Sequence, residues 1–112
     1  MEATIIRKDQ REYHEVTSFT KAFSRRVVSQ EKGEFRFMLS KIAPHGKVTP
    51  HSHEQFQLNM IERGAARMRV EEREYTLYDG DVIVIPGGAV HEMESHTDGD
   101  EVSYIEVKWL EV

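Results

Sequence analysis

GDVIVIPGGAVH, at residues 80–91, is the stretch of the sequence that decides the fold. An apolar run, Val82–Ile85, lies in it between two turn signals. Gly80 and Gly88 can take the positive φ angles that tight turns require. Pro86 ends the run, because proline has no amide proton to donate to a neighbouring strand. The stretch therefore predicts a short apolar strand between two tight turns.

The same pattern of short runs and turns extends toward both ends of the chain. Runs rich in Val, Ile, Phe and Tyr are broken by turn signals about every 8–12 residues, which is typical of an all-β sandwich or barrel. The run EFRFMLSKI, at residues 34–42, alternates apolar and polar side chains as a half-buried strand does. We expect strands at residues 21–29, 34–42, 55–62, 65–70, 74–77, 82–85, 90–94 and 101–110. We expect turns at 30–33 and 43–46, a hairpin about Arg63 and Gly64, a polar loop at 96–100, and a short helix only within 12–23.

Length and composition favour a globular domain without disulfides. The chain has 112 residues, enough for one domain at 1–112, in which residues 1–19 form a polar N-terminal segment. Hydrophobic residues make up 38% and charged residues 31%, a balance unlike that of a disordered or membrane chain. The net charge of −5 argues against nucleic acid as a partner. The sequence has no apolar run of about 18 residues, no signal-peptide core and no cysteine, so we expect a cytoplasmic protein that does not contact membranes.

A set of metal-ligating side chains occurs in HSHEQFQLNMIERG, at residues 51–64, and in the later stretch. His51, His53 and Gln57 share the parity of an extended strand, so their side chains would point to one face. His91 lies on another expected strand, which can pair nearby. Imidazole is the commonest ligand of first-row divalent metals, so the four side chains predict one metal site. The alternatives are exposed turn histidines, or a site that is empty or binds metal adventitiously.

Both stretches resemble the two sequence motifs of the cupin superfamily. The first motif is a glycine, HxH, a Glu or Gln, and a second glycine, and residues 46–64 are similar to it. Here one residue fewer separates Gly46 from His51, and Gln57 stands at the acidic position. The second motif is Gly, five residues, Pro-x-Gly, two residues and His, which the chain matches position for position within residues 80–95.

The resemblance implies an all-β fold, the double-stranded β-helix or jelly-roll barrel of RmlC-like cupins. It also implies one divalent metal ion near a mouth of the barrel, and nickel, zinc, manganese and iron all suit the four ligands. Small single-domain cupins of this type are usually homodimers. We therefore expect a homodimer, in which a second copy covers apolar strand surface that so short a chain cannot cover by itself.

Gln57 at a ligand position favours Lewis-acid chemistry over oxygen chemistry. A neutral amide leaves the ion its full charge, which attracts an anion and strengthens the polarisation of a bound carbonyl or hydroxyl. It also makes a higher oxidation state harder to reach. In this stretch the chain resembles the small cupins that linearise 4,5-unsaturated monouronates. Those enzymes also use an acidic residue on a late strand, where Glu106 falls, and a downstream arginine; no arginine follows Arg73, and Lys108 is the candidate in its place.

Further candidate residues lie on two strands. Tyr104, Glu106 and Lys108 share one face of the last expected strand. If that face lines the cavity, Glu106 is the general base, Lys108 a carboxylate anchor and Tyr104 a substrate contact; otherwise it is a solvent-exposed polar face. Gln55 is a candidate pocket residue beside the ligands. Arg36 lines the cavity if the apolar face of its strand packs outward, and is an exposed residue if that face packs inward.

The residues together predict a metal-dependent enzyme of isomerase or lyase type. Its substrate would be a small, anionic, sugar-acid-like molecule, as in the linearisation or isomerisation of an unsaturated uronate. One alternative is an iron-dependent cupin dioxygenase, which a requirement for dioxygen would distinguish. The other is a cupin that binds a small molecule without chemistry.

Overall fold

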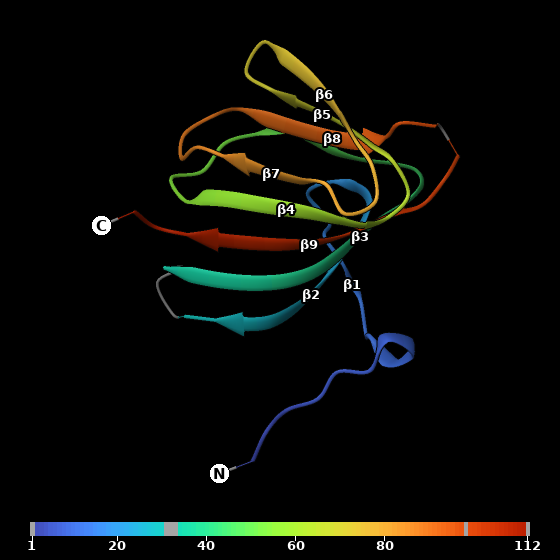
Figure 1. The fold of residues 1–112 in the computed structure, drawn as a ribbon, viewed down its shortest axis with the longest axis vertical. Coiled ribbons are helices and arrows are strands. Elements are labelled where there is room, and N and C mark those ends of the chain that lie inside the picture. The colour runs from blue at the N-terminus through green and yellow to red at the C-terminus, as the bar shows by residue number, and fades with distance from the viewer. Residues whose placement is uncertain (1, 31–33, 98, 112) are drawn as a thin grey trace.

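The computed structural model describes residues 2–30, 34–97 and 99–111, and it is almost entirely β-sheet. The strands are antiparallel and curl into a nearly closed barrel (Figure 1). A short 3₁₀ segment, η1 (Lys8–Gln10), is the only helix among the described residues. The strands are β1 (His14–Glu15), β2 (Thr20–Ser29), β3 (Phe35–His51), β4 (Phe56–Arg63), β5 (Ala66–Val70), β6 (Arg73–Leu77), β7 (Val82–Ile85), β8 (His91–Ser95) and β9 (Val102–Trp109).

The long strand β3 joins the two halves of the barrel. Its first part pairs with β2 on one edge and with β9 on the other, and its end pairs with β8. The main path of neighbouring strands is β6-β5-β8-β3-β9-β4-β7, with β2 also paired to β3 and β1 to β2. Figure 1 shows β6, β5 and β8 on one side of the barrel and β4, β9, β3 and β2 on the other. The all-β jelly-roll prediction is confirmed.

The predicted strands and turns around residues 80–91 are also confirmed. Strand β7 has the expected bounds, Val82–Ile85, and β8 follows from His91. Gly80 and Gly88 have φ angles of 84° and 85°, the left-handed region that glycine adopts without a steric cost.

The helix predicted within residues 12–23 is wrong. This segment contains β1 and the start of β2, which pair with His14 opposite Ser24. The amide of Val16 donates to the carbonyl of Ala22 at 2.8 Å, and the Ala22 side chain is buried. Pairing with a long neighbouring strand supplies hydrogen bonds and burial that a short isolated helix would lack, so the strand conformation is preferred.

Residues 43–46 form a bulge within β3 and not the predicted turn. The register of β2 and β3 shifts here, so that residues 43–46 lie opposite Lys21 alone. His45 has a φ angle of 65°. A Cβ on Gly46 would lie 2.7 Å from the carbonyl oxygen of Lys21, so this bulge requires glycine. Of the turn predicted at 30–33, residues 31–33 lie outside the described residues.

The hairpin predicted about Arg63 and Gly64 is wrong as well. Strand β4 pairs with β7 and β9, whereas β5 pairs with β6 and β8, so the chain crosses between the two halves of the barrel at this turn. Gly64 has a φ angle of 93°, and a Cβ there would lie 2.7 Å from the carbonyl oxygen of Glu101. The charged segment after it does form a hairpin, with Val70 opposite Arg73.

Strands β3 and β9 turn their polar faces toward the inside of the barrel. Arg36 on β3 and Glu106 and Lys108 on β9 line an internal cavity. Phe37 and Val107 are register partners of the opposite parity, so their side chains point outward. Of the two arrangements considered for these strands, the structure has the one in which the apolar face packs outward.

A compact apolar core adjoins the cavity, and Met68 and Met93 belong to both. Its least exposed side chains, at 0–2% exposure, are Ile42, Ile61, Ala66, Met68, Ile85, Met93 and Val102. No helix in the described part of the chain is long and apolar enough to span a membrane. The single domain at 1–112 and the cytoplasmic location stay predictions.

Candidate metal and substrate site

Three histidines converge at one end of the barrel. His51 ends β3 and lies directly opposite His91, the first residue of β8. His53 lies in the loop between β3 and β4. The ring centroids of His51 and His91 are 4.3 Å apart, and that of His53 lies 5.6 Å from His51 and 5.0 Å from His91. The pairing of β3 with β8 therefore brings together two residues that are forty positions apart in the sequence.

Backbone carbonyls fix which ring nitrogen of each histidine carries its proton. Each Nδ1 lies 2.9 Å from a carbonyl oxygen, which can only accept a hydrogen bond, so each neutral ring bears its proton there. Each Nε2 is then left with a free lone pair. One ligand nitrogen from each ring lies within 4.8 Å of the others. The Nε2 of His91 is buried and has no hydrogen-bond partner among the described residues.

Burial keeps two of these rings neutral. It lowers the pKa of His91 from 6.5 to about 4, and it also lowers the pKa of His51. The hydrogen bonds to Ala89 and Thr49 oppose this effect without cancelling it. At neutral pH the lone pairs of these rings are therefore available to a metal ion without the loss of a proton.

The amide of Gln57 is held with its oxygen toward the histidines. Its Nε2 donates to Asn59 Oδ1 at 2.9 Å and to Glu106 Oε1 at 3.2 Å. Its Oε1 lies 3.0 Å from His53 Nε2. The reverse orientation would set the amide oxygen against two other acceptors, so the hydrogen bonds favour the one described.

The donor set fits a divalent metal ion. The lone pairs of His53 Nε2 and Gln57 Oε1 face each other at 3.0 Å, a repulsive contact unless a cation or a proton lies between them. This is also the separation of neighbouring ligand atoms on an ion whose metal–ligand bonds are about 2.1 Å long. His51 and His91 add two more imidazole nitrogens. The predicted ligand set is thus brought together, three nitrogens and one amide oxygen.

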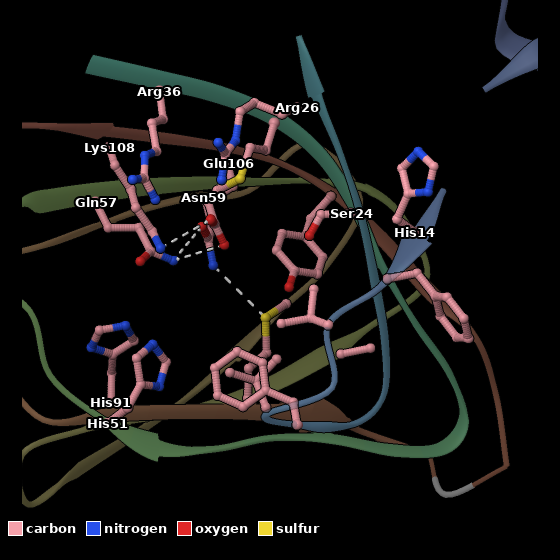
Figure 2. A pocket seen from close by; sticks show the side chains of 18 of the residues that line it. His14, Ser24, Arg26, Arg36, His51, Gln57, Asn59, His91, Glu106 and Lys108 are labelled. Carbon is pink, nitrogen blue, oxygen red and sulfur yellow. Dashed lines mark hydrogen bonds and ion pairs between the residues drawn. The ribbon is translucent and has the colours of Figure 1, made fainter. Parts of the chain in front are cut away.

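A cavity of about 460 Å³ opens beside these residues. His14 and Glu15 on β1 and Ser24 and Arg26 on β2 contribute to its polar lining. The polar lining nearest Gln57 consists of two cross-strand rows on β3, β9 and β4. Lys108 lies between Arg36 and Gln57 in one row. Glu106 lies between Met38 and Asn59 in the other. Figure 2 shows Arg36, Lys108 and Glu106 on one side of the cavity, across from His51 and His91.

Glu106 is a buried carboxylate with one hydrogen-bond donor and one ion-pair partner. It is 9% exposed, accepts a hydrogen bond from Gln57 Nε2, and lies 3.5 Å from Lys108 Nζ. Its surroundings therefore hold the carboxylate in place beside the candidate metal ligand Gln57.

The other predicted substrate contacts have different positions. Tyr104 lines the cavity, but it is only 4% exposed and its hydroxyl shares a hydrogen bond with Ser40. Burial raises its pKa. Gln55 lies in the loop, where its carbonyl oxygen accepts the hydrogen bond from His53 Nδ1; it does not belong to the cavity lining of the described residues.

Sequence reasoning missed three residues of this site. Asn59 orients Gln57, Arg26 lines the cavity from β2, and the Phe19 ring lies 4.9 Å from the ring of His51. For Asn59 a signal was available, because it shares strand parity with Gln57. Arg26 lies on β2, and Phe19 directly precedes this strand. The pairing of β2 with β3 is a long-range contact that a local pattern does not reveal.

The turn at Pro86 and Gly87 supports the loop that carries His53. The amide of Gly88 donates to the carbonyl of His53 at 2.8 Å. A Cβ on Gly87 would lie 2.3 Å from the carbonyl oxygen of Glu54. The second sequence motif thus supplies one ligand and also the backbone support of another.

Comparison with known proteins agrees with this arrangement. The profile of the cupin domain family matches residues 38–108, which include all four candidate ligands and Glu106. An H2HPP isomerase of Bacillus subtilis is 31% identical over 87 residues, or 76% of this chain. The chain spans only about a third of that relative, 36% of its length.

Solved structures share the same fold. KdgF from a Halomonas species superposes with a TM-score of 0.78 at 19% identity, covering 97% of this chain and 96% of that one. An RmlC-like cupin from Shewanella frigidimarina superposes with a TM-score of 0.78 at 14% identity, covering 96% and 90%. At these identities the likeness extends to the architecture of the barrel.

Proposed function

The chain belongs to the cupin family, and from that premise we propose that it is a metal-dependent enzyme of isomerase or lyase type. Its substrate is a small organic acid that bears a carbonyl or hydroxyl group. The observation that carries the proposal is the site itself, where three histidines with fixed tautomers and free Nε2 lone pairs adjoin a buried carboxylate.

Each element of the site has a defined task in this proposal. His51, His53, His91 and the Gln57 amide oxygen hold one divalent ion. When bound, the ion polarises a carbonyl or hydroxyl oxygen of the substrate. Because all four ligands are neutral, the site keeps the ion's positive charge and attracts an anion.

Glu106 moves the proton. An isomerisation next to a carbonyl removes a proton from one carbon and returns it to another, which one carboxylate in the cavity can do. Gln57 Nε2 and Lys108 Nζ keep the Glu106 carboxylate in position. Lys108 and Arg36, adjacent across β3 and β9, supply the positive charge that orients the substrate's own carboxylate.

The family relatives support the reaction type and not the substrate. The Bacillus subtilis relative is an isomerase by name, and the chain matches about a third of it. KdgF shares the fold over nearly the whole chain. A linearisation or isomerisation of a uronate remains one form of the proposal.

Two experiments test the proposal. Elemental analysis should find one divalent ion per native chain and almost none in a His53→Ala, His91→Ala double variant; equal metal content would refute the metal site. Proton NMR in D₂O should show metal-dependent deuterium exchange next to the carbonyl of a 2-oxo acid substrate. Glu106→Gln should lose this exchange while it keeps the metal, and retained exchange would refute the role of Glu106.

Assays on the same purified protein test the two alternative functions, the dioxygenase and the non-catalytic binding protein. Turnover under nitrogen excludes a dioxygenase. Turnover of any organic acid by the metal-loaded protein excludes a module that only binds its ligand.

A further inference from the structure

The cavity has two chemically different parts. Its volume, about 460 Å³, is in the range of small-molecule sites. The polar part comprises the rows around Glu106 and Lys108 described above. The remaining wall has a largely apolar stretch formed by Val16, Phe19, Val48, Met68 and Met93. Polar side chains from β1 and β2 border this stretch, namely His14, Glu15, Ser24 and Arg26.

The apolar wall offers little hydrogen bonding to a ligand. The Asn59 amide beside it already has partners: Asn59 Oδ1 accepts from Gln57, and Asn59 Nδ2 lies 3.9 Å and 3.8 Å from the sulfurs of Met68 and Met93. The Tyr104 hydroxyl is paired with Ser40. Ligand hydroxyl groups that face Val48, Met68 and Met93 would be buried and unpaired, and each unpaired group weakens binding by about tenfold or more.

An aromatic ring lies between this wall and the candidate metal ligands. The Phe19 ring is 4.9 Å from the ring of His51, centroid to centroid, and is partly buried against the core. Rings pack favourably on such a surface at centroid separations of about 4.5–7 Å. A ligand ring on Phe19 would therefore lie next to His51 and within the cavity.

The opposite side of the cavity carries two arginines, Arg26 and Arg36 (Figure 2). Arg36 Nε is buried without a hydrogen-bond partner in the described part of the chain. Neither Arg26 nor Arg36 takes part in an ion pair there. Figure 2 shows both side chains near Glu106, across from His51. The planar guanidinium group matches a carboxylate in shape and charge.

We propose that the ligand is a carboxylic acid with an aryl or cycloalkyl ring. Its carboxylate binds Arg36 and its ring packs on Phe19, Met68 and Met93. This deepens the proposed function, on which it rests, because it names the substrate class of the same cavity. It replaces the sugar acid favoured by the sequence with an acid whose body is apolar, since Phe19, Met68 and Met93 form an apolar stretch beside the candidate metal ligands.

Calorimetry on the full chain, freed of metal with EDTA, tests the proposal with two acids of equal charge. Phenylpyruvate carries an apolar ring, and galacturonate carries hydroxyl groups. We expect phenylpyruvate to bind at least tenfold more tightly. Equal or tighter binding of galacturonate, or no measurable binding of phenylpyruvate, would overturn the proposal.

Three variants locate the binding. Arg36→Gln should weaken phenylpyruvate binding by about tenfold or more, because a charge-assisted pair is lost. Phe19→Ser should weaken it about fivefold or more and leave galacturonate unchanged, while the matched control Phe19→Leu keeps an apolar wall and near-native affinity. Urea unfolding verifies that each variant is folded. Unchanged phenylpyruvate affinity in both Arg36→Gln and Phe19→Ser would overturn the proposal.

Failure of the ligand-class proposal can be distinguished from failure of the proposed metal-dependent function. Ring-acid binding is measured without metal, so it can succeed in a protein whose histidines bind no ion. That result would refute the metal-dependent enzyme and keep the ligand class. Metal binding together with tighter binding of galacturonate than of phenylpyruvate would keep the metal site of the proposed function and refute the ligand class.

Discussion

Replacement of Gln57 by glutamate tests why a neutral amide occupies this ligand position. The Gln57 Nε2 group donates to Asn59 Oδ1 at 2.9 Å and to Glu106 Oε1 at 3.2 Å. In Gln57→Glu an oxygen replaces this nitrogen, so both contacts become acceptor against acceptor. One of them also sets two carboxylates against each other.

The expected cost follows from the distance and from proton uptake. Two charges 3.2 Å apart at an effective dielectric constant of about 20 repel by about 5 kcal/mol. Gln57 is 3% and Glu106 9% exposed, so solvent screens little of this. Proton uptake sets a ceiling, because protonating a carboxyl with an ordinary pKa of about 4.3 costs about 4 kcal/mol at pH 7. Lys108 Nζ, 3.5 Å from Glu106, offsets part of the repulsion. We expect the metal-free protein to lose about 3 kcal/mol in free energy of unfolding.

Urea unfolding of EDTA-treated protein measures this loss. The matched control is the swap Gln57→Glu with Glu106→Gln, in which the introduced amide can donate back across the same contact. The swap should recover about 2 kcal/mol or more relative to Gln57→Glu alone. A loss under about 1 kcal/mol in the single variant, or a swap as unstable as the single variant, would refute the reasoning.

The same substitution should act in the opposite direction on metal binding. A carboxylate is a charged ligand, and a bound ion relieves its repulsion with Glu106. Competition with a chelator should therefore show tighter metal binding by Gln57→Glu, and turnover of an anionic substrate should fall. Unchanged affinity and turnover would contradict the role assigned to the neutral amide.

Four further predictions use other parts of the structure. A divalent ion at a hundred times its dissociation constant should raise the free energy of unfolding by about 2.7 kcal/mol, and His91→Ala should abolish the gain. The metal-free protein should lose stability as the pH falls from 6.5 toward 4. In this range His91 takes up a proton in the unfolded chain but not in the folded protein, where its pKa is about 4. Urea unfolding of His91→Gln should therefore show a weaker pH dependence. Gly87→Ala should lower both the melting temperature and the metal affinity, because its Cβ would lie 2.3 Å from the Glu54 carbonyl oxygen. In the control Gly88→Ala the Cβ meets nothing within 4 Å, so this variant should lose only the stability that the strained positive φ costs and keep its metal affinity. We propose that a second copy of the chain covers the outward apolar face of β3, β9, β4 and β7, so sedimentation should give a dimer. Val84→Lys, at a side chain on β7 that is 54% exposed, should convert this dimer to a monomer. The control Val90→Lys, at an exposed valine outside this face, should leave the dimer intact.

Local patterns were sufficient for the parts of the fold that depend on backbone chemistry. Gly80, Gly88 and Pro86 identify turns because few other residues tolerate those conformations, and the structure has those turns. The predicted convergence of His51, His53, Gln57 and His91 agrees with the structure because strand parity and a sequence motif both constrain their positions. The same signals failed at residues 43–46, since a proline and a glycine are compatible with a bulge as well as with a turn.

The less predictable features depend on contacts between distant strands. Alternation in β3 and β9 shows that two faces differ, yet the usual inference places the apolar face inside. Here the interior contains a cavity, and Arg36, Glu106 and Lys108 point into it while Phe37 points outward. The segment at residues 12–23 became strand because β2 pairs with β3, a long-range pairing that weak local periodicity does not specify.

The N-terminal segment and β2 contribute Val16, Phe19 and Arg26 to the cavity, although the family profile begins only at residue 38. The candidate metal ligands and the carboxylate at Glu106 all lie inside the profile. The candidate reactive groups and part of the cavity wall are therefore encoded in separate stretches of the sequence. We expect mutations in the first stretch to change ligand preference while the candidate metal ligands and Glu106 stay unchanged. An exchange of residues 14–26 between cupins would transfer ligand preference as a unit.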